Sequence, residues 1–186
     1  LVVAGAFDFV SGLKLVNLRS NSMHNAGKIN PGTMAAIIGL SSNEVENLCN
    51  RNSSGHLVVA ANYNTESQIV ISGHIEAVES LIKTAKDKGA RMAVLLNVGG
   101  AFHSPLMETA SAKLQHAIEA THFSNPICPI FQNVNALGTM DIIEIKNNLI
   151  EQLTSPVKWT QTLENMIQSG ANSFTESLQI GVEIFR

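Results

Sequence analysis

The spacing of hydrophobic positions changes several times along the chain, and each change predicts a new element. Apolar residues recur at helical spacing over residues 7–24, with Asp8 at the start and Ala26-Gly27 just past the end, which predicts a helix. Apolar runs and amphipathic stretches then follow one another as strand, helix, strand, strand, helix and strand. These six elements are expected over residues 33–40, 41–50, 57–63, 68–72, 74–88 and 91–98.

The order βαββαβ is that of a ferredoxin-like subdomain, which we expect over residues 32–98. Ser41 and Glu44 form a capping-box pattern at the start of its first helix. The last third of the chain alternates again, so the fold class is α/β, with further domain parts expected over residues 1–31 and 99–186. The elements expected there are a helix over 104–122, a strand over 130–134, helices over 140–153 and 156–169, and a short strand over 173–176.

One stretch combines a break in the pattern with a reactive side chain. The apolar run over residues 91–98 is expected to be a buried strand, Gly99-Gly100 lets the backbone turn, and Pro105 fits the first turn of the next helix. His103 is therefore predicted at a strand-to-helix corner, where an imidazole can face a cleft as a general base. From this local pattern alone, a capping or core histidine is the more common case.

Other polar residues have ordinary local explanations. Arg19 lies in the first predicted helix, where most arginines are solvated surface groups. Asn62 and Asn64 are expected at the end of the strand over residues 57–63, and asparagines in turns usually hydrogen-bond to their own backbone. His116 and His122 are expected on the helix surface, away from His103.

The composition of the chain argues against nucleic-acid binding and against a membrane span. The chain has 186 residues, 45% of them hydrophobic and 15% charged, with a net charge of -3 and 5% aromatic residues. This is typical of a globular protein and argues against a nucleic-acid surface, which requires basic patches or stacking platforms. No apolar run approaches the roughly 18 residues of a membrane span. We expect neither nucleic acid nor a membrane as partner.

The two cysteines indicate the cellular compartment, and the first residues indicate whether the chain is part of a longer protein. Cys49 and Cys128 have no C-x-x-C spacing, so we expect no disulfide framework and no metal site, and a reducing cytoplasm. The sequence opens at Leu1 without Met, in the middle of an apolar pattern. We therefore expect this chain to be a piece of a longer protein.

Four separated motifs give the polar candidates a common context. They are the helix of Arg19, AANYN followed by QIVISG over residues 60–73, GAFHSPLM over 100–107 and QLTSPVKW over 152–159. In this order, with a ferredoxin-like insertion among them, they resemble the malonyl-CoA:acyl-carrier-protein transacylases. The resemblance covers nearly the whole chain, but only the middle and later part of a family member. It implies a partial α/β-hydrolase-like acyltransferase core with an inserted ferredoxin-like subdomain.

The resemblance also implies roles for individual residues. His103 matches the histidine that activates a serine nucleophile, and Gln152 matches the glutamine whose backbone carbonyl orients that histidine. Arg19 matches the arginine that pairs with the malonyl carboxylate, for which a guanidinium offers two parallel donors. Asn62 matches an asparagine of the active-site wall, and Asn64 is a weaker match. The serine itself, in a G-H-S-x-G sequence, is expected a few residues before Leu1.

The implied reaction is ping-pong transfer of a malonyl group from malonyl-CoA to the phosphopantetheine thiol of acyl carrier protein, in fatty acid biosynthesis. Malonyl-CoA and acyl carrier protein are the expected partners, no cofactor is expected, and we expect a cytoplasmic monomer. Without the serine, residues 1–186 alone are expected to be inactive. Two alternatives stay open: a non-catalytic ferredoxin-like binding module, in which His103 is structural, and an inactive acyltransferase fragment. The family's glycine-proline-glycine loop is not visible over residues 177–186, which leaves the packing of that stretch undefined.

Overall fold

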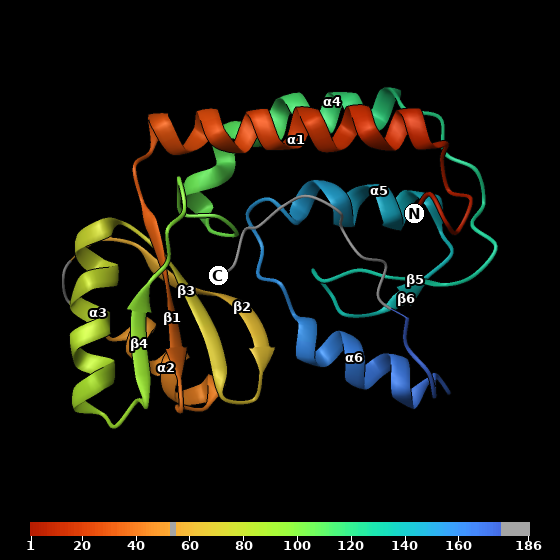
Figure 1. The fold of residues 1–186 in the computed structure, drawn as a ribbon. Coiled ribbons are helices and arrows are strands. Elements are labelled where there is room, and N and C mark those ends of the chain that lie inside the picture. The colour runs from red at the N-terminus through yellow and green to blue at the C-terminus, as the bar shows by residue number, and fades with distance from the viewer. Residues whose placement is uncertain (53–54, 176–186) are drawn as a thin grey trace.

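A small antiparallel sheet and a group of helices lie next to each other in the computed structural model, which describes residues 1–52 and 55–175 (Figure 1). The sheet is formed by β1 (Thr33–Ile38), β2 (Val58–Thr65), β3 (Gln68–Gly73) and β4 (Met92–Leu95) in the order β2-β3-β1-β4. All its neighbouring strands are antiparallel. With α2 (Ser42–Asn50) and α3 (Ile75–Asp87) in the connections, this is the predicted ferredoxin-like arrangement, within the stretch expected for it.

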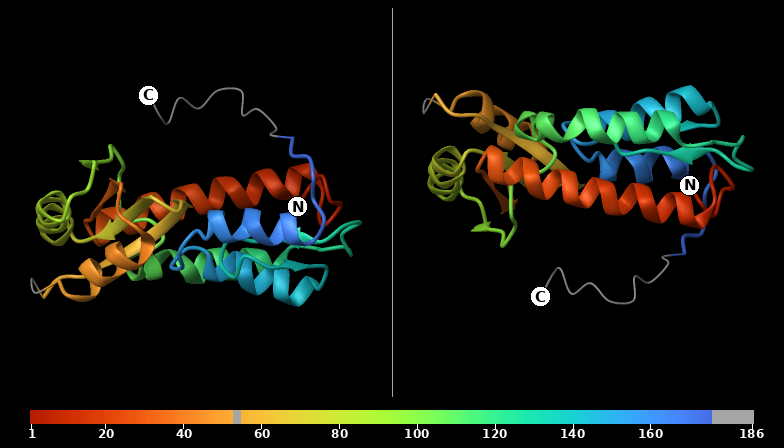
Figure 2. Two further views of the ribbon diagram at one scale, coloured as in Figure 1. Left: turned by 90° about the horizontal axis from the view of Figure 1, so that it is seen from below. Right: turned by 90° about the horizontal axis from the view of Figure 1, so that it is seen from above.

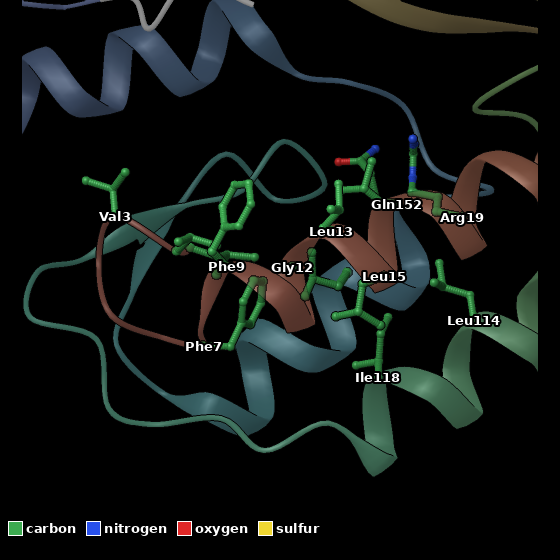
Figure 3. Close-up of a pocket in the computed structure, with 14 residues that line it drawn as sticks. Val3, Phe7, Phe9, Gly12, Leu13, Leu15, Arg19, Leu114, Ile118 and Gln152 are labelled. Atoms are coloured by element: carbon green, nitrogen blue, oxygen red, sulfur yellow. The ribbon is translucent and has the colours of Figure 1, made fainter.

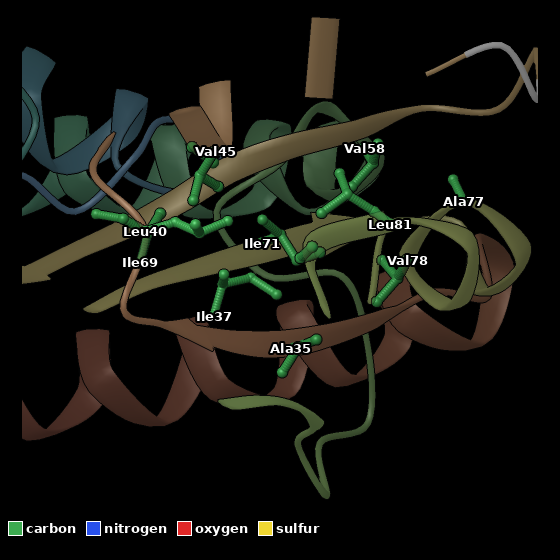
Figure 4. Packing of buried hydrophobic residues seen from close by; sticks show 13 residues of the cluster. Ala35, Ile37, Leu40, Val45, Val58, Ile69, Ile71, Ala77, Val78 and Leu81 are labelled. Atoms are coloured by element: carbon green, nitrogen blue, oxygen red, sulfur yellow. The ribbon is translucent and has the colours of Figure 1, made fainter. Parts of the chain in front are cut away.

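The two connecting helices pack on one face of this sheet. Apolar side chains that alternate along β1 and β3 meet apolar side chains of α2 and α3, and together they form a closed core (Figure 4). Its fully buried members include Ala35, Ile37, Val45, Ile69, Ile71, Ala77 and Val78. The sheet therefore has a hydrophobic core of its own, between this face and the two helices.

The start of α2 follows the predicted capping box. The Ser41 side chain accepts a hydrogen bond from the backbone N–H of Glu44, and the Glu44 carboxylate accepts one from the backbone N–H of Ser41 at 2.8 Å. Two backbone donors that the helix cannot satisfy are thereby paired. The sequence therefore predicts the beginning of this helix correctly.

The fourth strand is shorter and more exposed than predicted. β4 pairs only with β1 and forms one edge of the sheet, so three of its four side chains, Met92, Val94 and Leu95, are exposed. The expectation of a buried strand over residues 91–98 is wrong, because an apolar run does not distinguish an edge strand from a central one. β2, in turn, extends to Thr65, so Asn62 and Asn64 lie within a strand and not in a turn.

Helices make up most of the remaining chain. α1 (Phe9–Ile29) runs beside the 3₁₀-helix η1 (Pro105–Ala110) and α4 (Ser111–Ala120), and α4 packs on α5 (Ile142–Glu151), as Figures 1 and 2 show. Their shared core contains Ala26, Met107, Leu114, Ile118, Ile145 and Leu153. α6 (Trp159–Gln168) contacts β2, and β5 (Ile130–Phe131) pairs with β6 (Gly138–Thr139).

Several boundaries in this part differ from the predictions. α1 begins after Asp8, whose side chain caps it as expected, but it continues through Gly27 to Ile29 because that glycine lies in a tightly packed helix turn and not past a helix end. The helix expected over residues 104–122 begins as a 3₁₀ turn, and β5 has only two residues. Residues 173–175 form no strand; Glu176 and the stretch 177–186 lie outside the described residues.

Candidate active site

His103 lies on the segment that joins β4 to η1, and its side chain is half-buried. Its backbone φ is 57°, in the left-handed region, which costs a non-glycine residue on the order of 1 kcal/mol or more. The next residue holds this turn in place: the Ser104 hydroxyl donates to the Ala101 carbonyl at 2.6 Å and accepts from the Leu106 N–H at 3.3 Å. Ser104 is fully buried. It therefore caps the start of η1.

A carbonyl at the end of α5 meets the histidine ring. Gln152 is the C-cap of that helix, where backbone carbonyls lack an intrahelical partner, and its carbonyl oxygen lies 3.0 Å from His103 Nδ1. The Gln152 side chain turns elsewhere: its amide donates to the carbonyls of Ser155 at 3.0 Å and Pro156 at 3.2 Å. The side chain stabilises the turn, and the main chain orients the imidazole.

This contact determines which ring nitrogen carries the proton. A carbonyl oxygen can only accept, so Nδ1 donates and Nε2 of the neutral ring keeps its lone pair. Burial lowers the pKa of His103 below its ordinary value, the hydrogen bond with Gln152 partly opposes this, and the positive charge of Arg19 lowers the pKa further. The neutral ring, with a free acceptor at Nε2, is therefore favoured near pH 7.

Arg19 projects from α1 toward the same region and is half-buried. Burial lowers the pKa of its guanidinium, which remains charged at any pH of interest. Across residues 1–52 and 55–175 it forms no hydrogen bond or ion pair. A partly buried cation without a counter-ion is unfavourable, so the site is suited to receive an anionic group.

Arg19 and Gln152 also lie at one end of an apolar groove with a cavity of about 530 Å³ (Figure 3). The opposite end is formed by the N-terminal loop and the start of α1, where Val3 and Phe9 are 95% and 69% exposed. The remaining lining is mostly apolar: Leu1, Val2, Phe7, Gly12, Leu13, Leu15, Val16, Leu114, Ile118 and Leu149. We call this surface the α1 groove.

The two asparagines have different surroundings. Two hydrogen bonds join β2 to Val157, in the segment after Gln152. The Tyr63 N–H donates to the Val157 carbonyl, and the Val157 N–H donates to the Ala61 carbonyl, both at 2.8 Å. Asn62 lies between these bonds, and its buried Oδ1 has no hydrogen-bond partner within the described residues, so it could accept from a ligand. No hydrogen bond in the described part connects Asn64 with His103, Arg19 or Gln152.

Other reactive groups stand apart from this site. Among the described residues, no three His, Cys, Asp or Glu side chains are close enough together to hold a metal ion, and no helix is long and apolar enough to cross a membrane. His116 and His122 are exposed, as predicted. Both cysteines are free, and burial raises the pKa of Cys49 to about 12, which keeps it in the unreactive thiol form.

The structure thus brings His103, Arg19 and Gln152 together from a loop, a helix and a helix end, and places Asn62 on a strand tied to the last of these. Two features of the site were missed in the sequence: the left-handed conformation of His103, and the close approach of Gly27 to Gly99-Gly100. Histidine is enriched among the few non-glycine residues at positive φ, but most histidines have negative φ, so the residue type alone does not predict this conformation. The glycine pair was interpreted only as a turn, although glycine also marks places where two backbones meet.

Comparison with known proteins agrees with this geometry. Residues 1–177 match the model of the acyl transferase domain, so the chain belongs to that family. Among curated proteins it is similar to the malonyl CoA-acyl carrier protein transacylases of Haemophilus influenzae, at 38% identity over 170 residues, and of Bacillus subtilis, at 37% over 177 residues. These alignments cover 91% and 95% of the chain, but 54% and 56% of the relatives.

Solved structures give the same result for the fold. The malonyl CoA-acyl carrier protein transacylase of Coxiella burnetii superposes with a TM-score of 0.88 at 37% identity, covering 91% of this chain and 54% of that one. Another, with a TM-score of 0.87 at 35% identity, is a malonyl-transacylase in complex with its type II PKS acyl-carrier protein; the match covers 91% of this chain and 55% of that one. The α/β acyltransferase fold is therefore confirmed, and the chain spans about half the length of the relatives it matches.

Proposed function

We propose that this chain forms the histidine-bearing part of an enzyme that transfers a malonyl group from malonyl-CoA to the phosphopantetheine thiol of acyl carrier protein, in fatty acid biosynthesis. The single observation that carries the proposal is the 3.0 Å contact between His103 Nδ1 and the Gln152 carbonyl. It fixes the ring in the tautomer that leaves Nε2 free as a general base. The names of the relatives supply the substrates.

In the proposed reaction, His103 acts twice. Nε2 first takes the proton of a serine hydroxyl while the serine oxygen attacks the thioester carbon of malonyl-CoA, and it then protonates the departing coenzyme A sulfur. In the second half, Nε2 takes the proton of the phosphopantetheine thiol, whose sulfur attacks the malonyl-serine ester, and it returns the proton to serine. The Gln152 carbonyl stabilises each transient imidazolium by accepting from Nδ1–H.

Arg19 would bind the free carboxylate of the malonyl group. Its guanidinium has no counter-ion within the described residues, and two parallel N–H donors match a planar carboxylate. The bound carboxylate would also neutralise the charge that lowers the pKa of His103. Substrate binding would thereby make the imidazolium easier to form at the moment it is needed.

The nucleophile has to come from outside residues 1–186, because their sequence contains no G-H-S-x-G and Ser104 is buried in its capping bonds. We place the serine-bearing segment on the α1 groove, which ends at Arg19 and Gln152. Monomers rarely expose contiguous apolar surface of this kind. For experiments we define the extended enzyme as residues 1–186 preceded by an acyl transferase segment that carries this serine.

The other parts of the proposal follow from the reaction. Malonyl-CoA is a substrate, and the chemistry uses only side chains, backbone and thioester, so no cofactor is required. Acyl carrier protein is the macromolecular partner; this is supported by the solved complex of a similar malonyl-transacylase with its carrier. We further propose a cytoplasmic monomer, in keeping with two free cysteines. Asn62 and Asn64 are proposed for the substrate-binding wall, with Asn62 the better supported of the two.

The test is a transfer assay with radiolabelled malonyl-CoA and holo acyl carrier protein. The extended enzyme should form a labelled carrier protein, with a labelled enzyme intermediate that appears when the carrier is omitted. Residues 1–186 alone should give neither product. Transfer by residues 1–186 alone, or none by a folded extended enzyme, would overturn the proposal; the second outcome would favour a non-catalytic binding module.

A further inference from the structure

The C-terminal turns of α1 pack directly against the loop that carries His103. Gly27 and Gly100 are both buried, and a Cβ atom on Gly27 would overlap the carbonyl oxygen of Gly99 and lie 3.4 Å from the Gly100 Cα. From the other side, a Cβ on Gly100 would lie 3.3 Å from the Gly27 Cα. The helix and the loop therefore touch backbone to backbone, with no side chain between them.

A glycine at this place in α1 is unfavourable for the helix itself. Glycine inside a helix costs about 1 kcal/mol relative to alanine. Gly27 lies in the last turn of α1, before the C-cap Asn30, and not at positive φ, so it is not the left-handed glycine that commonly follows a helix end. A local reason for glycine is therefore missing. The close approach of residues 99–100 supplies one, because only a residue without Cβ allows it.

One hydrogen bond and a second close approach hold the same loop against the chain at and just after the end of α1. Asn30, the C-cap of α1, donates from its side-chain amide to the Leu106 carbonyl at 3.1 Å. A Cβ on Gly32 would lie 2.7 Å from the Ala101 side chain. The loop is thus held against the end of α1 both before and after His103, which has the strained φ of 57°.

α1 also carries Arg19, so one rigid element contacts both functional groups. The rise of 1.5 Å per residue places Gly27 about 12 Å along the helix axis from Arg19. The position of the loop on α1 therefore fixes how far the imidazole lies from the guanidinium. It also sets whether Nδ1 reaches the Gln152 carbonyl, since that carbonyl belongs to a different helix, α5.

We propose that Gly27 is a positioning residue for the general base: by admitting the backbone of Gly99-Gly100, it sets the location of His103 between Arg19 and Gln152. This inference rests on the proposed function for its catalytic meaning. The contact itself does not depend on that function. Gly27 touches no reacting atom, and its effect is transmitted through the loop.

The experiment compares three variants: Gly27→Ala, Gly99→Ala and Gly100→Ala. Gly99 is the matched control, because a Cβ there would meet no atom within 4 Å. Two readouts are needed: the NMR titration of the His103 ring, which requires no activity, and kcat of malonyl transfer by the extended enzyme. Thermal unfolding establishes that each variant is folded.

For Gly27→Ala we expect the His103 pKa to rise toward its ordinary value, because burial is the largest cause of its lowering and displacement of the loop exposes the ring. The groups that face the ring, Arg19, the Gln152 carbonyl and the backbone of Ser155, are unchanged in identity. We expect kcat to fall by roughly 10²-fold, the size of effect that a displacement of about 1 Å can have. Gly99→Ala should alter neither quantity.

If Gly27→Ala does not fold, Gly100→Ala decides, because its Cβ would require shifts of only a few tenths of an ångström; it should change both readouts in the same direction, by less. The inference would be overturned if a folded Gly27→Ala variant left the His103 titration and kcat unchanged. Where Gly27→Ala does not fold, the same result in Gly100→Ala would overturn it. An equal effect of Gly99→Ala would also overturn it. A shifted titration in an extended enzyme without transfer activity would reject the proposed function and leave the contact established.

Discussion

The sheet and the helical part differ in how completely each covers its own apolar surface. In the sheet, Ile37, Ile69 and Ile71 are fully buried under α2 and α3. In the helical part, Phe9 and Leu13 on α1 are 69% and 58% exposed, although α1 is otherwise packed on η1 and α4. The sheet has a covered core under α2 and α3, with exposed apolar side chains on its edge strand β4, whereas the helical part has a core on one side of α1 and an open groove on the other.

The residues proposed for catalysis belong to the open part. His103, Arg19 and Gln152 all come from it, and the sheet contributes Asn62 through the bonds between β2 and Val157. A sheet with its own core can hold a wall in place, but the proposed site, whose nucleophile comes from outside residues 1–186, requires a surface on which another segment can lie. In the proposed function, the sheet is therefore the scaffold and the helical part is the surface that receives the serine-bearing segment.

The largest effect expected is the loss of the general base. In the extended enzyme, His103→Ala should lower kcat by roughly 10²–10⁴-fold, because Nε2 no longer accepts the serine proton. Thermal unfolding should change little, since the ring is only half-buried. The matched control is His116→Ala, which removes an exposed histidine of α4 and should retain full activity. A wild-type rate in His103→Ala would make this histidine structural.

How much of this was predictable differs between the same two parts. The sheet was predicted element by element, because apolar runs, amphipathic stretches and a capping box at Ser41 are local signals. The exposure of β4 was not predicted. It follows from the position of β4 at the edge of the sheet, and local sequence patterns do not show the order of strands. In the helical part, the break in the pattern singled out His103, whereas the roles of Arg19 and Gln152 came only from the resemblance.

Three features of the helical part could not be predicted from the sequence and are visible only in the structure. The continuation of α1 through Gly27 reflects a contact with residues distant in sequence, and tertiary packing overrides the local preference of glycine for a helix end. The positive φ of His103 is maintained by the bonds of Ser104. That Arg19 has no counter-ion among the described residues depends on which side chains do not reach it, and a sequence cannot show that.

The second-largest expected effect is the loss of stability caused by a cavity in the core of the sheet. Ile71→Ala should lower the free energy of unfolding by about 2–5 kcal/mol, because Ile71 is fully buried and a cavity would remain. The loss should be the same in residues 1–186 and in the extended enzyme, since α2 and α3 already cover this face. Chemical denaturation of both proteins measures it. A loss that differs clearly between the two would mean that the sheet core is not closed on its own.

A smaller effect is expected from the cation at the end of the α1 groove. In the extended enzyme, Arg19→Ala should weaken malonyl transfer by about 1.5–3 kcal/mol in kcat/KM relative to acetyl transfer, because only malonyl has a carboxylate to pair. Arg19→Lys should restore little, since an ammonium lacks the planar pair of donors. Competition assays with the two thioesters give the ratio. Equal losses for both would assign Arg19 to the fold or to coenzyme A.

The smallest effect tests the open side of α1 directly. Leu13 lies in the α1 groove with 58% of its surface exposed, so Leu13→Ala should change the stability of residues 1–186 by less than about 0.5 kcal/mol. In the extended enzyme the same substitution should cost about 1–2 kcal/mol, because burial of the rest of a leucine side chain contributes about that much. The comparison uses the same substitution in two proteins, which removes the helix propensity of the new residue from the difference.

The control for this pair lies on another surface of the helical part. Ile143 on α5 is 71% exposed but does not line the α1 groove, so Ile143→Ala should have the same small effect in both proteins. If Leu13→Ala were equally mild in both, the added segment would not cover the groove. The exposed apolar residues of α1 would then need another occupant, such as a second copy of the chain, and analytical ultracentrifugation of residues 1–186 would detect that copy as a concentration-dependent dimer.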